Sequence, residues 1–466
     1  MIKNTDWPYL TTIDVDELRR RLPEAWQRVL LGTLDAILDR SRRDPDYPFI
    51  DTKISTLTGR ELSSDSGASD LTGKDTIYSW IQGRGLEALA GHHQWVRTLT
   101  TLPVTTRHAY TSAIEAHVRE TVTAMEDIRR DCGDGMFFWF DRAGRPFETG
   151  TDGVSHPIVL NTDQSRPSDV FYLKGLQASA HLLGDADLRD RACAYYIKVM
   201  SDLNNGRFVS DQQAFDPKNR VVPVPGRHSH GAWMLSIGTC ALFAETSDDP
   251  RYVADGLACV RHIIDNHVNL GGRWPDLLPH DFVEFIDDDG LPWRENGHVA
   301  CDPGHALEFV GLSLKLFHVI ERQGRPCAAQ QSFMNECREV FPEVLTHAFT
   351  LGFNPKAEGI CKLYSLSERR PLNTDMPWWN LPETMRAAAF ALELGPREPI
   401  LEIIRRCSNA YLGQYVNPLV HMMAFQTRDA AGKPVAVIPA TPDADPGYHT
   451  GLSIIDFLGR LGSSFE

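Results

Sequence analysis

Two kinds of helical segment alternate along this chain of 466 residues. In the first kind, apolar residues recur every four positions and charged residues lie between them, which gives each helix one buried stripe and one wet face. These segments run over 18–38, 110–122, 186–204, 253–264, 330–352 and 396–413. The second kind is apolar nearly all round, which predicts helices buried on every side. These segments begin near Asp75, Ser168, Ser229, Asp302, Leu381 and Gly447.

Six half-buried helices that alternate with six buried ones predict two concentric rings. The connections into the buried helices also repeat, because 140–146, 286–292 and 428–434 each contain an Asp and a Gly between short apolar runs, a pattern that favours a tight hairpin. The predicted fold is therefore all-α: an (α/α)6 barrel of six helical hairpins, with short β-hairpins and long loops at one end, in a single catalytic domain over 1–466. A seven-unit ring or an open solenoid is the alternative.

The charge balance restricts the partners of such a barrel. With 62 acidic against 47 basic residues, the formal net charge is -15, which argues against binding to nucleic acid or to an anionic membrane. No apolar run is long enough to span a membrane, and the first ten residues lack the apolar stretch of a signal peptide. A cytoplasmic protein is therefore expected, with a homodimer as one option for its oligomeric state.

No cofactor and no metal are predicted. The nine cysteines are scattered singly and form no CxxC pair, which is typical of buried small hydrophobic residues in a reducing compartment. The histidines lie on separate units, and the HExxH spacing of a helix-borne zinc site is absent. The phosphate-binding loops GxGxxG and GxxxxGK[ST] and the GxSxG nucleophile elbow are absent as well.

Polar residues collect where the buried helices begin. In a closed helix ring these starts converge on one pocket, and the helix N-termini add a positive partial charge that suits a polyhydroxyl or an oxyanion. His305 and Glu308 are three residues apart and therefore share one helix face. An Asp-Pro-Gly motif directly precedes His305 and, one residue removed, His449. The alternative for this motif is a capping cluster, with Asp302 as the N-cap.

Further candidates belong to the same predicted pocket. Arg84 lies in a stretch with few other charges, and a buried guanidinium needs either a carboxylate or a bound substrate oxygen. Trp378 and Trp379 can stack on a sugar face, although aromatic residues also fill cores. Either His228 or His230 can line the site, or each can satisfy loop groups instead.

These motifs resemble the N-acylglucosamine 2-epimerase family, which includes cellobiose 2-epimerases and mannose isomerases. The resemblance covers the chain from about 45 to 460. The matching pieces are Trp-Ile-Gln-Gly-Arg at 80–84, Pro-Gly-His-Ala-Leu-Glu at 303–308, Trp-Trp-Asn-Leu-Pro-Glu at 378–383, Tyr-His at 448–449, the hairpin at 141–146 and the helix start at 249–252.

The resemblance implies an (α/α)6 barrel and cofactor-free proton chemistry at C1 and C2 of a sugar. It implies that His305 and His449 are the catalytic acid/base pair and that Arg84 holds the substrate oxygens. Glu308 and Glu383 are then expected to support the histidines and the sugar.

One departure from the family pattern concerns the third buried helix. The family usually has a third His there, followed three residues later by Glu. In this chain the best candidate is His230, which has Trp233 three residues later and lies about one helical turn out of register.

The Ser-, Thr- and Gly-rich stretch 52–73 is a candidate lid or specificity loop.

The chemistry expected of this set begins with a neutral His, which removes the C2 proton of an open-chain sugar. Arg84 and helix N–H groups would stabilise the resulting cis-enediolate. Return of the proton to the other face of C2 gives an epimer, and delivery to C1 gives a ketose.

Two alternative functions come from other classes of protein. One is a glycoside hydrolase on the same barrel, with a carboxylate pair such as Glu308 and Glu383. The other is a non-catalytic barrel that binds carbohydrate or protein.

Overall fold

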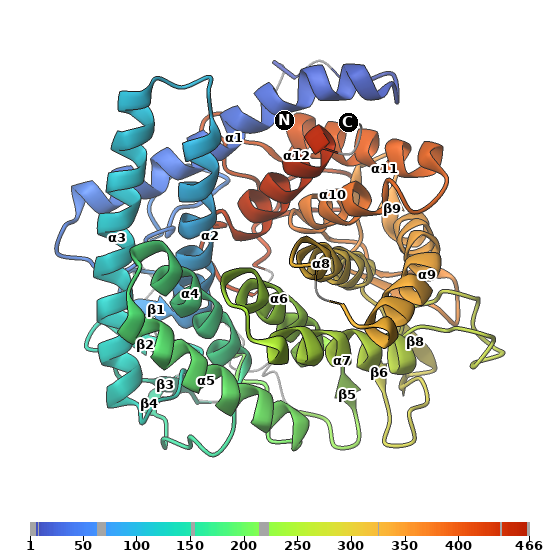
Figure 1. The fold of residues 1–466 in the computed structure, drawn as a ribbon, viewed down its shortest axis with the longest axis horizontal. Coiled ribbons are helices and arrows are strands. Elements are labelled where there is room, and N and C mark those ends of the chain that lie inside the picture. Colours follow the sequence, from blue (N-terminus) through green and yellow to red (C-terminus); the bar gives the residue numbers. More distant parts are fainter. Residues whose placement is uncertain are drawn as a thin grey trace.

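The helices form two concentric rings (Figure 1). The computed structural model describes residues 6–7, 9–62, 71–150, 154–213, 223–324, 326–438 and 440–463. The inner helices in this part of the chain are α2 (Ser79–Thr98), α4 (Pro167–Leu183), α6 (Gly231–Thr246), α8 (Pro303–Arg322), α10 (Asn380–Ala391) and α12 (Ser453–Ser463). The outer helices are α1 (Val15–Arg43), α3 (Val104–Asp131), α5 (Ala186–Asn204), α7 (Pro250–His267), α9 (Ala328–Gly352) and α11 (Arg397–Ala410).

The predicted (α/α)6 barrel is confirmed. Each inner helix packs against the next, and α12 with the preceding π-helical turn η2 (Tyr448–Leu452) packs against α2, which closes the ring. The outer helix α1 packs against α12, α11 and α3, so the first and last helices lie side by side (Figure 1). A second π-helical turn, η1 (Tyr411–Tyr415), extends α11. The six-unit ring therefore excludes the seven-unit and open arrangements.

Burial follows the two sequence patterns. In α1, the six apolar residues spaced four apart, from Leu18 to Leu38, are all buried while the charged residues between them face outward. In α10, by contrast, all twelve residues are buried. The apolar sequences of the inner helices are thus explained by neighbours on every side.

Short strands lie between the helices. They are β1 (Thr76–Tyr78), β2 (Trp139–Asp141), β3 (Phe147–Thr149), β4 (Ser155–Pro157), β5 (His228–Ser229), β6 (Phe285–Ile286), β7 (Arg294–Glu295), β8 (His298–Cys301), β9 (Phe353–Asn354), β10 (Gly359–Ile360), β11 (Leu363–Ser365), β12 (Arg370–Asn373), β13 (Met376–Pro377) and β14 (Thr427–Arg428). The antiparallel pairs β1–β2, β5–β6 and β13–β14 each join the strand before an inner helix to the strand after the following outer helix. Within the described chain, β12-β11-β8-β7 is the largest sheet.

The three predicted hairpin turns are confirmed. Each one is closed by an isolated bridge, and the side chain of its Asp accepts from backbone N–H groups two and four residues later, at 2.8 to 3.0 Å. The Asp residues are Asp141, Asp287 and Asp429. Each turn then needs a left-handed residue, and glycine supplies it with φ between 73° and 79°.

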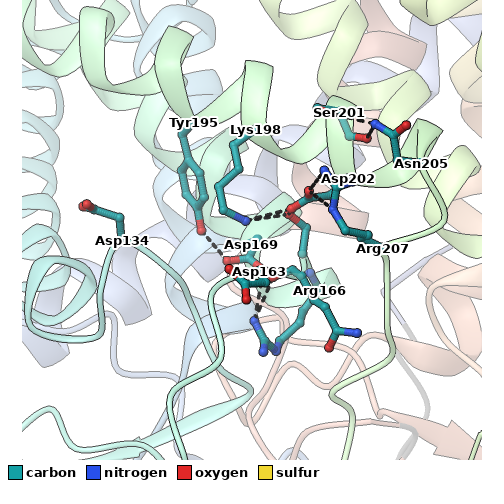
Figure 2. Close-up of polar contacts among 12 residues, drawn as sticks. Asp134, Asp163, Arg166, Asp169, Tyr195, Lys198, Ser201, Asp202, Asn205 and Arg207 are labelled. Atoms are coloured by element: carbon teal, nitrogen blue, oxygen red, sulfur yellow. Dashed lines mark hydrogen bonds and ion pairs between the residues drawn. The ribbon is translucent and has the colours of Figure 1, made fainter.

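Polar contacts tie the start of α4 to α5 (Figure 2). Asp169 accepts hydrogen bonds from the backbone N–H of Arg166 (2.6 Å) and from the hydroxyl of Tyr195 (2.5 Å). On α5, Asp202 accepts from Lys198 (2.8 Å) and Arg207 (2.7 Å). These buried carboxylates fix the position of an inner-helix start, which is where the functional side chains lie.

A close backbone approach joins α2 to α4. A Cβ atom on Gly83 would lie 2.3 Å from the carbonyl oxygen of Phe171, and one on Gly175 would lie 2.6 Å from the carbonyl oxygen of Gly83. Because backbone atoms of both helices would have to move, each position requires glycine.

Replacing Gly83 with Ala is therefore expected to lower the free energy of unfolding by about 2–3 kcal/mol, since the added methyl overpacks a helix crossing. Chemical denaturation measures this change. The matched control is Gly459→Ala on α12, where a Cβ meets no atom within 4 Å. This control should gain up to about 1 kcal/mol from helix propensity. Equal stabilities of the two variants would contradict the close crossing.

None of the helices in the described ranges is both long and apolar enough to cross a membrane.

Candidate active site

The two Asp-Pro-Gly motifs shape the backbone at two inner-helix starts. Asp302 caps α8, and its Oδ1 accepts from the N–H of Gly304 at 2.9 Å. Asp445 accepts from the N–H groups of Tyr448 (2.9 Å), His449 (3.3 Å) and the residue after it (2.8 Å). Asp302 is therefore the N-cap, as the capping interpretation predicted, whereas Asp445 lies two residues before the N-cap of η2 (Tyr448–Leu452) and binds the first N–H groups of that turn. Neither arrangement competes with a catalytic role, because each motif places a histidine at the mouth of the barrel.

His305 and His449 both pack against Trp379. The ring centroids of His305 and Trp379 are 5.5 Å apart, and those of His449 and Trp379 are 5.6 Å apart. Trp378 approaches His449 edge-on at 6.2 Å. Two imidazoles from sequence positions far apart are thus brought together beside two tryptophan rings.

His449 forms a dyad with Glu383 of α10. Its Nδ1–H donates to Oε1 of Glu383 at 2.9 Å, and Ser453 donates to the same oxygen at 3.0 Å. The other oxygen accepts from Arg386 at 2.7 Å. Burial alone would raise the pKa of Glu383, but Arg386 and then His449 outweigh it and lower that pKa. An ionised carboxylate only accepts hydrogen bonds, so Nδ1 of His449 carries the proton and Nε2 is left for chemistry.

His305 forms a second dyad with Glu284, which directly precedes β6. Its Nδ1–H donates to Oε1 of Glu284 at 2.9 Å, and Asp302 lies 3.6 Å from the same nitrogen. Burial alone would lower the pKa of His305, but the charges of Asp302 and Glu284 outweigh it and raise the pKa to about 9. At neutral pH this imidazole is therefore protonated. Its side chain is 26% exposed, against 11% for His449, so both rings reach the pocket.

Glu308 follows His305 by one helical turn and is buried. One of its carboxylate oxygens lies within 4.8 Å of ligand-type atoms of Glu383 and His449. Burial and then the charge of Glu383 raise the pKa of Glu308. The shift favours the protonated form of Glu308 relative to an exposed carboxyl group.

Arg84 lies among aromatic rings. Its guanidinium carbon is 4.1 Å from the ring centroid of Phe171, 5.4 Å from that of Trp80 and 5.5 Å from that of Tyr448. Its Nε is buried and has no hydrogen-bond partner within the described chain. Burial lowers the pKa of Arg84. A guanidinium held by rings keeps its N–H groups available for substrate oxygens.

Lys174 holds Tyr448 beside this guanidinium. Its ammonium donates to the hydroxyl of Tyr448 at 2.6 Å and pairs with Glu87 at 2.9 Å, deep between the inner helices. Burial raises the pKa of Tyr448 to about 12, so the phenol stays neutral.

The histidines at the start of α6 take separate places. His230 is fully buried, and its Nε2–H donates to Oε2 of Glu284 at 3.2 Å. His228 is exposed and pairs with Asp288 at 2.7 Å. Of the predicted lid 52–73, the first residues are buried, and Thr52 accepts a backbone hydrogen bond from Ala444 at 2.9 Å. Residues 63–70 lie outside the described residues.

Several residues of the site were not predicted from the sequence. Arg386 had a readable signal, because it follows Glu383 by three residues on an otherwise apolar helix. The sequence signals for Ser453 and Lys174 were weaker. Glu284 stands just before the apolar strand β6, and nothing local relates it to His305.

The histidines and carboxylates do gather into two groups with the composition of metal ligands. One is His230, Glu284 and His305, and the other is Glu308, Glu383 and His449. In both groups the imidazole N–H groups are directed at carboxylate oxygens, and Arg386 already supplies a cation to Glu383. The arrangement therefore suits proton transfer better than ion binding.

The fold places the chain among the (α/α)6-barrel proteins. It is similar to the cellobiose 2-epimerase from Spirochaeta thermophila DSM 6192, with a TM-score of 0.64 and 13% identity, over 96% of this chain and 99% of that one. It is similar to a D-mannose isomerase, with a TM-score of 0.60 and 12% identity, over 91% and 97%. A family 76 glycoside hydrolase from a bovine Bacteroides thetaiotaomicron strain has a TM-score of 0.52 and 10% identity, over 94% and 78%.

The chain belongs to the N-acylglucosamine 2-epimerase (GlcNAc 2-epimerase) family, whose model matches residues 92–450. It is accordingly a carbohydrate epimerase or isomerase. A search of the curated proteins gave no match.

Proposed function

We propose that this enzyme moves a proton at C1 and C2 of a reducing sugar, through a cis-enediolate, with His305 and His449 as the acid/base pair. The observation that carries the proposal is the placement of the two imidazoles around Trp379, each with Nδ1–H donated to its own carboxylate. This leaves Nε2 of each ring for the sugar. We also propose that the whole chain acts as one catalytic unit on a small-molecule sugar.

The two histidines have different roles in this scheme. His449 is the base: its Nε2 takes the proton from C2, and the electron pair of the broken C–H bond forms the C1–C2 double bond. His305 is protonated at neutral pH, so it protonates O1 as charge develops there. For the 2-epimer, O1 gives its proton back to His305 as the C1 carbonyl re-forms, C2 takes a proton from solvent on the face opposite His449, and His449 releases its proton to solvent. For the ketose, His449 returns its proton to C1, and the O2 hydroxyl gives up its proton to His305 as the C2 carbonyl forms.

Arg84 and Glu308 bind the oxygens. The planar guanidinium of Arg84 can donate to two oxygens of the enediolate and stabilise their charge, and its Nε has no partner among the described residues that would compete. Glu308, with its raised pKa, donates a hydrogen bond to a sugar hydroxyl. Trp378 and Trp379 form the wall on which the sugar packs.

Glycoside hydrolysis by a carboxylate pair fits these residues less well than proton transfer does. Glu383 is buried and its two oxygens accept from His449, Ser453 and Arg386, so neither oxygen faces a glycosidic bond. A hydrolase needs both carboxyl groups free to act on the glycosidic bond or on water, and the contacts of Glu383 leave only Glu308 of this pair for such a role.

The test is a panel of reducing sugars and oligosaccharides in deuterated water, followed by proton NMR. One sugar should form its 2-epimer or ketose and gain deuterium at C2 or C1. Dialysis against a chelator beforehand should leave the rate unchanged, because no step uses a metal. Cleavage of a glycosidic bond without such exchange would overturn the proposal. A loss of turnover that one divalent ion restores would instead revive the two metal-like groups.

A further inference from the structure

One carboxylate, that of Glu284, serves two imidazoles behind the pocket. Its Oε1 accepts from Nδ1–H of His305 at 2.9 Å, and its Oε2 accepts from Nε2–H of His230 at 3.2 Å. The two imidazole centroids are 5.3 Å apart. The Glu284 side chain is 9% exposed and that of His230 is 0% exposed, so His305 alone of the three reaches the pocket.

The surrounding backbone fixes this carboxylate in place. The N–H of Glu284 donates to the carbonyl of Ala300 at 2.8 Å, and the N–H of Asp302 lies 3.3 Å from Oε2 of Glu284. On the far side, Nδ1–H of His267 donates to the carbonyl of Val283 at 2.9 Å. Glu284 is thus held by the junction between β8 and α8, and it cannot follow His305 if that ring turns.

The charge of Glu284 is compensated differently from that of Glu383. Arg386 donates to Glu383 directly, so that carboxylate does not depend on a protonated histidine. The cation near Glu284 is Lys362, whose ammonium pairs with Asp302 at 2.6 Å. The imidazoles of His305 and His230 are therefore the hydrogen-bonding side chains that meet the charge of Glu284.

We propose that Glu284 is a positioning residue that holds His305 with Nε2 toward the sugar and keeps it protonated as the proton donor, while His230 acts only through Glu284. The inference rests on the proposed function for its catalytic meaning. It makes the two dyads unequal: the His305 dyad is a proton donor, and the His449 dyad is a base. The third histidine at the start of α6 is then a partner of Glu284 and not a ligand of the sugar.

The groups that face His305 predict the direction of its pH response. Asp302 and Glu284 favour the charged ring, Lys362 opposes it, and Glu308 lies one turn further along α8. His230 contacts His305 from the start of α6, and His449 contacts the same Trp379 ring as His305. Because a raised pKa means that the proton is lost only as the pH rises through about 9, removing one favouring charge must bring that loss to a lower pH.

The experiment is Glu284→Gln, which keeps the shape and removes the charge. We expect the alkaline limb of kcat to move down by about 1–2 pH units and kcat at neutral pH to fall about 10- to 100-fold. KM should stay within about threefold, because Glu284 does not contact the sugar. The matched control is Asp288→Asn, which removes an exposed carboxylate, paired with His228, from the same segment and should change none of these quantities.

An NMR titration of the His305 imidazole tests its pairing with Glu284 and does not require a substrate. The His305→Asn variant identifies which signal belongs to His305. The midpoint should lie near pH 9 in the wild type and fall in Glu284→Gln. If no sugar is turned over, the proposed function fails while this titration still decides the pairing. An unshifted midpoint or alkaline limb in Glu284→Gln would overturn the inference.

His230→Asn serves as a second variant if Glu284→Gln does not fold. It should leave KM within about threefold and leave the alkaline limb near pH 9 or above, since Glu284 keeps its charge. A large rise in KM with an unchanged pH profile would mean that His230 contacts the sugar, which contradicts the inference.

Discussion

Replacing either His305 or His449 with Asn should lower kcat by about 100-fold or more, because general acid–base catalysis is lost while the pocket stays. Asn matches one donor position of the imidazole but cannot exchange a proton near neutral pH. Substrate binding should persist in both variants, since Arg84 and the tryptophan wall are unchanged. Steady-state kinetics on the sugar identified by the panel, with a thermal melt to confirm folding, measures the effect.

The two variants should differ in deuterated water. His305→Asn keeps the base His449 and its partner Glu383, so it should still exchange the C2 proton with solvent without forming product. His449→Asn should lose that exchange. His228→Asn is the control, because this exposed histidine pairs with Asp288 outside the pocket and its loss should leave the rate unchanged. Near wild-type turnover in both active-site variants would show that the acid/base assignment is wrong.

Arg84→Lys should be nearly as damaging as Arg84→Ala, with a loss of about 2–4 kcal/mol of transition-state stabilisation in kcat/KM. The guanidinium lies 4.1 Å from the Phe171 ring and presents a planar fork of donors, whereas an ammonium is a point charge on a flexible stem. The lysine could keep the charge but could not donate to two substrate oxygens from that position.

The control for Arg84 is Arg251→Lys, which changes an exposed guanidinium paired with Asp249 and should leave kcat/KM unchanged. Equal thermal melts of the Arg84 variants would separate catalysis from stability. A Lys variant with near-normal kcat/KM would show instead that Arg84 is structural.

Much of the fold could be predicted because its signals are local. The four-residue spacing in α1 predicted the buried stripe, and Asp141, Asp287 and Asp429 predicted hairpin turns that the structure contains. Likewise, Asp302 and Asp445 hold their helix starts through bonds to residues within five positions. Each of these features depends on contacts within one or two turns of backbone, so a short stretch of sequence specifies it.

Parts of the site could be predicted for the same reason, and parts could not. His305, Glu308, His449 and Glu383 stand in recognisable motifs at inner-helix starts. The hydrogen-bond partners of the two histidines could not be predicted, because they are distant in sequence. His449 and Glu383 are 66 residues apart, and His305 and Glu284 are 21 apart, with a hairpin and a strand between them.

The sequence by itself determined the alternation of helices, the turns and the cap at Asp302, and it supplied the candidate residues for the proposed chemistry. Only the tertiary structure decided which histidine meets which carboxylate, and it made the environments of His305 and His449 unequal. The physical reason is that a pKa depends on charges a few ångströms away in space, and closure of the helix ring sets those distances. Arg386 donates to Glu383, whereas the imidazoles of His305 and His230 and the backbone N–H of Asp302 donate to Glu284, and no local pattern encodes that difference.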